Sequence, residues 1–160
     1  MTQGSGLRDA YSATITRTKA QKGSKSSLGM EALMWLSHSE RPLEVNEICH
    51  ALGVEIGSTD LNPQNVPAIE TLLGCTLGLV TVEASSSIVR LVHYTLQEYL
   101  ADNTNLFHSP HSMIAEVCLT YLLSVHQGHF PLEEAWDISR TAMAGNTPAR
   151  ICLLLLGNTR

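Results

Sequence analysis

The sequence predicts a mainly α-helical domain that carries one β-hairpin. Along several segments before residue 78, apolar residues recur at spacings of three and four, which is typical of helices that bury one face. Between residues 79 and 93, two runs rich in β-branched residues are separated by the small-residue turn ASSS. Such runs around a short turn are typical of two paired strands.

Four helices are expected before the hairpin, at residues 7–21, 28–38, 44–52 and 66–77. The first would use Leu7, Tyr11 and Ile15 as its buried face. The second is apolar almost all round, which predicts that it lies at the centre of the domain. The fourth is expected to be capped by Asn65, with Pro67 in its first turn.

The hairpin is expected to lead directly into another helix. Thr95 is followed three residues later by Glu98, a capping-box pattern that predicts a helix beginning at Leu96. Pro110 is expected to open a further helix. Three helices, then a hairpin, then a helix that leaves its second strand is the order of a winged helix, with the hairpin as the wing.

The composition suits a single domain with appendages. The chain has 160 residues, 44% of them hydrophobic, and no apolar run approaches the roughly 18 residues that a membrane span needs. The first 27 residues lack the apolar core of a signal peptide, so a cytoplasmic protein is expected. Cysteines stand singly in apolar surroundings, which favours reduced thiols; they are Cys49, Cys75, Cys118 and Cys152.

Charge is distributed unevenly along the chain, whose net charge is -5. The first 25 residues hold five bases against Asp9 alone, and this acid-poor end also fits a transit peptide. The helix expected at residues 66–77 has no Lys or Arg and contains Glu70, and the wing offers only Arg90. Because DNA binding depends on neutralising backbone phosphates, nucleic acid is not expected as a partner.

No catalytic or metal site is predicted. The segment KGSKSS lacks the Gly-Lys pair and the preceding strand of a phosphate-binding loop. His108 with His111, and His126 with His129, have a spacing that two metal ligands could use, but no carboxylate or thiolate partners stand nearby. The chain also has no G-x-S-x-G nucleophile motif, so we do not expect an enzyme.

Three ordered segments carry a resemblance to a known family. They are GLRDAYSATITRTKAQKGSKSSLGMEALMWLSHSERPLEVNEICHALGVEIGS, IETLLGCTLGLVTVE and VRLVHYTLQEYL. Over residues 6–124 the chain resembles the region that follows the nucleotide-binding core in fungal-type NACHT proteins. These proteins are STAND signalling NTPases, and many end in ankyrin repeats. The same module is also named after GPI inositol-deacylase, a label that does not by itself imply deacylase activity.

The resemblance implies a role for one histidine. In this family the winged helix folds over bound ADP, and a histidine at the H-[YF]-T/S-L-Q-E-[YF]-L junction contacts the β-phosphate. The matching residue here is His93, with Gln97 and Glu98 one turn further on; Glu98 is expected to be the capping-box acid. Taken without the motif, His93 would be a partly buried histidine bonded to the backbone, so both interpretations stay open.

The chain also departs from the family pattern. It has no Walker A or Walker B segment, so ADP or ATP is expected only if the chain joins an NTPase core, in cis or in a related protein in trans. The segment TAMAGNTPARICLLLLGN has a faint likeness to half an ankyrin repeat. The expected function is a non-catalytic regulatory module. The alternative is a standalone interaction adaptor, or a truncated fragment with no retained activity.

Four segments are therefore predicted. They are a helical tail of a preceding NTPase module with a linker (1–27), the winged-helix domain (28–103), a following helix and loop (104–131), and a helical tail with the ankyrin-like segment (132–160).

Overall fold

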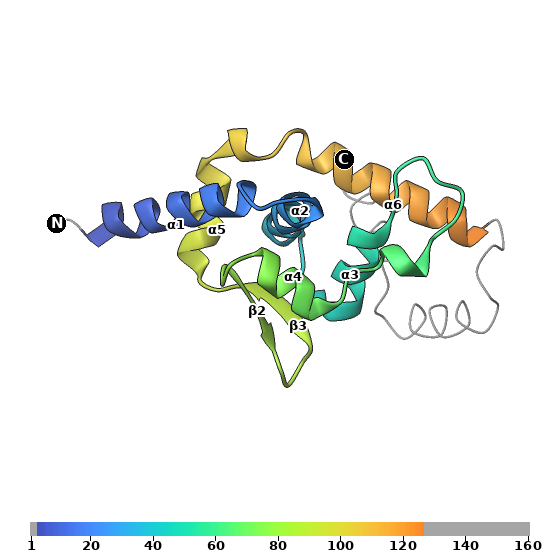
Figure 1. Ribbon diagram of the computed structural model, residues 1–160, viewed down its shortest axis with the longest axis horizontal. Coiled ribbons are helices and arrows are strands. Elements are labelled where there is room, and N and C mark those ends of the chain that lie inside the picture. The colour runs from blue at the N-terminus through green and yellow to red at the C-terminus, as the bar shows by residue number, and fades with distance from the viewer. Residues whose placement is uncertain (1–2, 127–160) are drawn as a thin grey trace. The chain divides into compact units, whose positions relative to one another are not determined.

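The computed structural model of the chain describes residues 3–126 (Figure 1). Within that range the chain forms two compact units. The first comprises the residues up to Val45 together with Ala68–His108, and the second comprises Asn46–Pro67 and the residues from Ser109 on. The tail predicted at 132–160 lies outside the described residues, as do His129 and Cys152. The four predicted segment boundaries stay predictions.

The first unit contains most of the regular structure. Its elements are α1 (Gln3–Lys19), α2 (Ser24–His38), β1 (Leu43–Glu44), α4 (Ile69–Cys75), β2 (Val80–Glu83), β3 (Ile88–Leu91), α5 (Tyr94–Asp102) and the 3₁₀ helix η2 (Thr104–Leu106).

Helix α2 lies at the centre of this unit, as predicted. Four consecutive residues of α2 are buried, Ala32 to Trp35, and the helix contacts α1, α4, α5 and β3. Figure 1 shows α2 nearly end-on, with α1, α5 and α4 around it. The helix begins at Ser24 rather than at Leu28, because the break after α1 is confined to a short turn in which Gly23 has φ of 67°.

The carboxyl half of α1 and the end of α4 both approach α2 closely at Gly29. A Cβ atom at Gly29 would lie 2.7 Å from the Cys75 carbonyl oxygen and 2.8 Å from Cγ2 of Thr18. The Gln21 side-chain amide donates to the same Cys75 carbonyl at 2.6 Å. Glycine is therefore required at this position of α2, because any side chain would collide with backbone.

At its amino end α1 differs from the prediction. The helix starts before Leu7, and Leu7 is 42% exposed, whereas Tyr11 and Ile15 are buried as expected. Two of the three predicted apolar positions therefore belong to the core.

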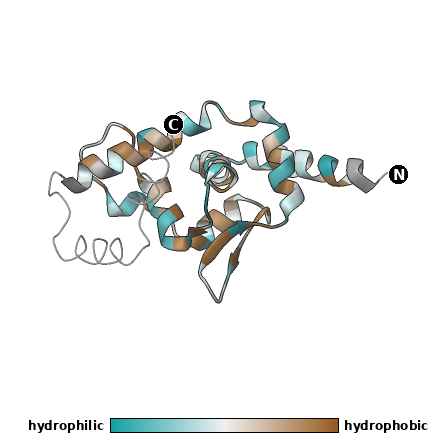
Figure 2. Ribbon diagram, turned by 180° about the vertical axis from the view of Figure 1, so that it is seen from behind, coloured by the Kyte–Doolittle hydropathy of each residue, from teal (hydrophilic) through white to brown (hydrophobic). Residues whose placement is uncertain are grey.

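The sheet has three antiparallel strands in the order β1-β3-β2. Strands β2 and β3 form the predicted hairpin, with Val80 opposite Leu91, and Figure 2 shows both strands mostly in brown. Strand β1 was not predicted. It pairs Leu43 with Val89, and it is only two residues long, so it has no alternating pattern of its own.

The start of α4 also corrects the sequence analysis. Asn65 does not cap this helix: the N-cap is Ala68, whose side chain makes no capping hydrogen bond, and Pro67 lies before the helix rather than in its first turn. The asparagine that does cap is Asn62, whose Oδ1 accepts from the Gln64 backbone N–H at 3.0 Å and starts a separate 3₁₀ turn.

The second unit contains α3 (Val45–Gly53), the 3₁₀ helix η1 (Pro63–Asn65) and α6 (Pro110–His126). Pro110 opens α6 as predicted. Ile114, Val117, Cys118 and Tyr121 of α6 are buried at the spacing of one helical face.

The predicted class is confirmed. Among the described residues the chain has six α-helices and one small three-stranded antiparallel sheet. Cys49, Cys75 and Cys118 are buried. No helix in the described part of the chain is long and apolar enough to cross a membrane.

Candidate functional site

The junction between β3 and α5 is built around His93. After β3 ends, the Val92 N–H donates to the Leu79 carbonyl at 2.9 Å, and His93 then takes an extended conformation as the N-cap of α5. Its ring Nδ1 accepts from the Thr95 backbone N–H at 3.3 Å, and its carbonyl accepts from the Leu96 N–H at 3.1 Å. One residue therefore satisfies two donors in the first turn of α5.

This arrangement replaces the predicted capping box. The helix begins at Tyr94 rather than at Leu96, and His93 occupies the cap position that was assigned to Thr95. Glu98 is exposed and makes no capping bond in the described structure. The backbone bond expected of a structural His93 is present, but the ring is exposed rather than partly buried.

The hydrogen bonds of His93 fix where its proton lies. A backbone N–H can only donate, so Nδ1 must accept, and a neutral ring then carries its hydrogen on Nε2. Among residues 3–126, Nε2 has no hydrogen-bond partner. The structure therefore leaves one N–H of an exposed imidazole available to an acceptor outside the described residues.

A second contact on Nδ1 comes from the Thr95 side chain. Thr95 Oγ1 lies 2.9 Å from His93 Nδ1 and 2.8 Å from the hydroxyl of Tyr11, a buried residue of α1. The His93 ring also lies against Tyr94, with ring centroids 4.4 Å apart. The imidazole is thus held by two residues of α5, and one of them, Thr95, is bonded in turn to α1.

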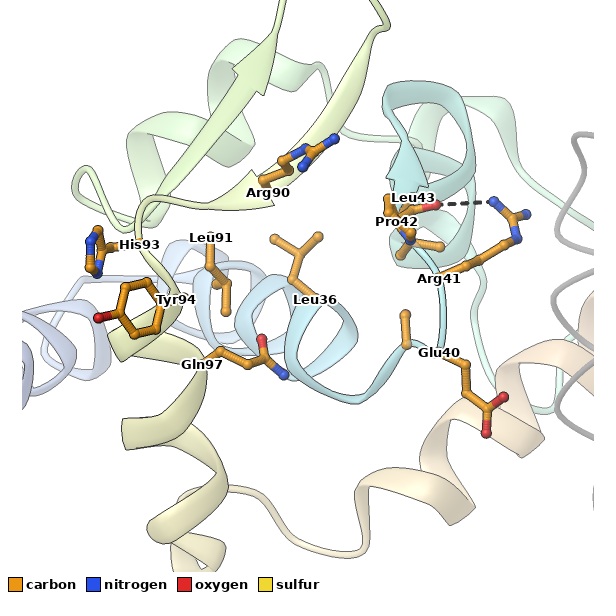
Figure 3. A pocket seen from close by; sticks show the side chains of 11 residues that line it. Leu36, Glu40, Arg41, Pro42, Leu43, Arg90, Leu91, His93, Tyr94 and Gln97 are labelled. Atoms are coloured by element: carbon orange, nitrogen blue, oxygen red, sulfur yellow. Dashed lines mark hydrogen bonds between the residues drawn. The ribbon is translucent and has the colours of Figure 1, made fainter.

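Beside this junction lies an open pocket of about 370 Å³ (Figure 3). One wall comes from the end of α2 and the chain leading into β1: Leu36, Ser39, Glu40, Arg41, Pro42 and Leu43. The other wall comes from β3 and the start of α5: Arg90, Leu91, His93, Tyr94 and Gln97. In Figure 3 His93 and Tyr94 lie together at one end, and Arg41 lies at the other.

The two arginines of this pocket are unusual in the sequence. Between residues 26 and 126 they are the only Lys or Arg residues, against eleven Asp and Glu. Arg90 Nη2 is 3.2 Å from a Glu83 carboxylate oxygen across the hairpin, and Arg41 Nη1 donates to the Pro42 carbonyl at 3.1 Å. Both positive groups of this acidic region therefore border one pocket.

Gln97 joins two walls of the pocket. Its side-chain amide donates to the Ser37 carbonyl at 2.7 Å, which ties α5 to the last turn of α2. Gln97 lies one turn beyond His93, and its bond to Ser37 holds α5 against α2.

The other sequence candidates do not form a site. Within residues 3–126, no three His, Cys, Asp or Glu side chains come close enough to hold a metal ion. His108 precedes α6 and His111 lies in its first turn, whereas the second predicted pair includes His129, outside the described residues. Helix α4 contains Glu70 and no base.

Two residues that take part in the site were not predicted from the sequence. Tyr11 was assigned to the core, and its contact with Thr95 joins residues 84 positions apart. Arg41 was not singled out, although the scarcity of bases after residue 25 was a usable signal. A pattern that spans several elements cannot be found from local periodicity.

The order of helices, the hairpin and the capped helix after it define a winged-helix domain. A family model described as "GPI inositol-deacylase, winged helix domain" matches residues 15–120. The chain belongs to this family, which confirms the winged-helix resemblance noted in the sequence. No curated protein and no solved structure matches the chain.

Proposed function

We propose that this winged helix is a non-catalytic regulatory module of a NACHT-type signalling NTPase in the cytoplasm. It would act on a nucleotide-binding core supplied in cis or by a related protein in trans. The observation that carries the proposal is the state of His93: an exposed imidazole, capped on Nδ1, with Nε2–H directed to no described residue.

The chemistry of this nitrogen suits a phosphate. The N-cap bond to Thr95 orients the ring before any ligand arrives, so little conformational freedom is lost when Nε2–H meets an anion. A hydrogen bond to a charged group contributes about 1.5–3 kcal/mol. ADP bound to the NTPase core would supply that group, and His93 would favour the closed, ADP-bound state.

Two substitutions separate this role from simple helix capping. Ala at position 93 removes both the cap and the donor, whereas Asp keeps a good N-cap acceptor but removes the donor and adds a repelling charge. In a complex with the NTPase core, identified by sequencing the native transcript and by co-purification, we expect both variants to release ADP about 10–100-fold faster. Unfolding midpoints should fall for His93→Ala only. If His93→Asp keeps the parent ADP off-rate, His93 serves only as a cap.

A second function has its own support in the pocket. Its apolar floor, with Leu36 and Leu91, and its border with Arg41 and Arg90 suit a protein segment that pairs an apolar side chain with a carboxylate. Glu40 on the same border would disfavour a purely acidic segment. The module would then be a standalone interaction adaptor.

Short peptides that pair leucine with glutamate test this alternative. Methyl NMR signals of Leu36 and Leu91 should shift on titration, and Arg90→Gln should weaken binding by several-fold. Arg17→Gln is the matched control, because Arg17 is an exposed arginine that does not line the pocket. Shifts that persist unchanged with a leucine–glutamine peptide would contradict recognition of the carboxylate.

A further inference from the structure

Three side chains connect the buried face of α1 with the exposed imidazole. The Tyr11 hydroxyl lies 2.8 Å from Thr95 Oγ1, and Thr95 Oγ1 lies 2.9 Å from His93 Nδ1. Tyr11 is buried, Thr95 is half-buried and His93 is exposed, so the series runs from the core to the surface.

The direction of these hydrogen bonds can be worked out. Nδ1 already accepts from the Thr95 backbone N–H, so this nitrogen carries no hydrogen. The Thr95 hydroxyl must then donate to Nδ1, since two acceptors would otherwise face each other at 2.9 Å. Thr95 has one hydroxyl hydrogen, so Tyr11 donates to Thr95 Oγ1. The series is therefore Tyr11 O–H to Thr95 O–H to His93 Nδ1.

We propose that Thr95 and Tyr11 are positioning residues for His93, and that through them α1 controls the imidazole. The two donors share the single lone pair of Nδ1, and the Thr95 hydroxyl, at 2.9 Å, lies closer to it than the backbone N–H, at 3.3 Å. Tyr11 strengthens the second donor, because hydrogen bonds in series polarise one another. A displacement of α1 would withdraw Tyr11 and loosen the ring without any direct contact with it.

The positioning role concerns the ring alone and needs no ligand. Its consequence for a nucleotide rests on the proposed function. By the family resemblance, α1 is the tail of the NTPase helical subdomain. If the proposed function holds, a movement of α1 would change how well His93 holds a phosphate.

The test is the nitrogen NMR spectrum of the histidine rings in the full 160-residue chain. The sample is labelled with ¹⁵N-histidine and kept alkaline enough for neutral imidazoles. Seven histidines contribute signals, and the His93 signal is the one that disappears in His93→Asn. Hydrogen bonding to an unprotonated ring nitrogen moves its resonance upfield, so the loss of a donor moves it downfield.

Four variants give the expected pattern. Thr95→Val should move the His93 Nδ1 signal downfield most, and Tyr11→Phe should move it in the same direction by less. Thr95→Ser, which keeps the hydroxyl, should leave the His93 Nδ1 signal where it is in the parent protein. Asp102→Asn is the matched control, because it breaks another α1–α5 contact, the Arg8–Asp102 ion pair, without touching the series. It should leave the signal unmoved.

Two results would overturn the proposal. One is an unchanged Nδ1 signal in Tyr11→Phe, which would mean that α1 does not reach the ring. The other is an equal displacement in Asp102→Asn, which would mean that any disturbance of α1 suffices. Because the measurement uses no nucleotide, these results are independent of the ADP off-rates, and the failure of one proposal is distinguishable from the failure of the other.

Discussion

The two halves of α1 are held by different kinds of contact. At the carboxyl half, Thr18 is fully buried, and its Cγ2 lies 2.8 Å from the place that a Cβ atom of Gly29 in α2 would take. At the amino half the contacts with α5 are polar or aromatic: Arg8 pairs with Asp102 at 2.8 Å, and its guanidinium carbon lies 5.7 Å from the Tyr99 ring centroid. The ion-paired side chains are 52% and 58% exposed.

This difference indicates which half can adjust. The place between the Thr18 side chain and Gly29 has no room for an added atom, because interiors are packed as densely as crystals. An exposed ion pair contributes only about 0–1 kcal/mol and can form and break in place. The carboxyl half of α1 is therefore a fixed point, and the amino half, which includes Tyr11, is the part that a partner could displace.

The largest effect is expected at the fixed point. Gly29→Ala forces a methyl group against the Cys75 carbonyl, and overpacking of this kind costs about 1–3 kcal/mol. The gain in helix propensity offsets about 1 kcal/mol of that. We expect a net loss of about 0–2 kcal/mol in the free energy of unfolding, measured by urea denaturation.

Gly74→Ala is the matched control. Gly74 is also helical, but it is exposed and a Cβ there would meet nothing within 4 Å. This variant should gain about 0.5–1 kcal/mol from helix propensity. If both glycine variants change stability in the same direction, the carboxyl half of α1 is not a tightly packed point, and the contrast between the halves fails.

A smaller effect is expected at the adjustable half. Asp102→Asn removes the ion pair with Arg8 and should lower stability by less than about 0.5 kcal/mol. The difference from the parent should vanish in high salt, where exposed charges are screened. A loss above about 1 kcal/mol that persists in high salt would mean that the amino half is as firmly held as the carboxyl half.

A pH-dependent effect is expected from Glu31, which lies on α2 two residues beyond Gly29. Burial raises the pKa of the Glu31 carboxyl above its ordinary value of 4.5. The carboxylate has no hydrogen-bond or ion-pair partner in the described part of the chain. The Glu31 carboxylate therefore binds its proton at a higher pH in the folded state than in the unfolded state. As a result, the charged Glu31 lowers the stability of the fold at neutral pH. That penalty disappears as the pH falls through the raised pKa toward 4.5.

Glu31→Gln should accordingly be more stable than the parent at pH 7, and the difference should shrink in mild acid. Glu98→Gln, at an exposed position of α5, should change neither the stability at pH 7 nor its dependence on pH. Thermal unfolding across this pH range is the measurement. A Glu31→Gln variant that is less stable at pH 7 would show that the carboxylate has a favourable partner after all.

Elements whose sequence pattern lies within one short segment were predicted well. The hairpin was found because β-branched runs and a four-residue turn lie together in sequence, and α2 was placed centrally because it is apolar on every side. Strand β1 was missed because two residues have no periodicity, and its pairing with β3 is what makes it a strand. Asn65 looked like a cap, but α4 begins only at Ile69, and the asparagine that caps is Asn62, which starts a separate 3₁₀ turn.

For the site, the sequence identified His93 but not its setting. The Thr95–Glu98 pattern suggested a capping box, yet the imidazole one residue before the helix competes for the same N–H and takes it. The contribution of Tyr11 could not be predicted, because its contact with Thr95 joins α1 to α5 across 84 residues of sequence.

The distance in sequence between Tyr11 and Thr95 also orders events on the ribosome. At about 5–20 residues per second, roughly 4–17 s pass between the synthesis of these two residues. Helix α2 follows α1 directly, so it is available as a partner for most of that interval, whereas α5 is not. The nascent chain therefore assembles α1 with α2 first, adds α4 against Gly29 next, and acquires the hydroxyl series to the imidazole last.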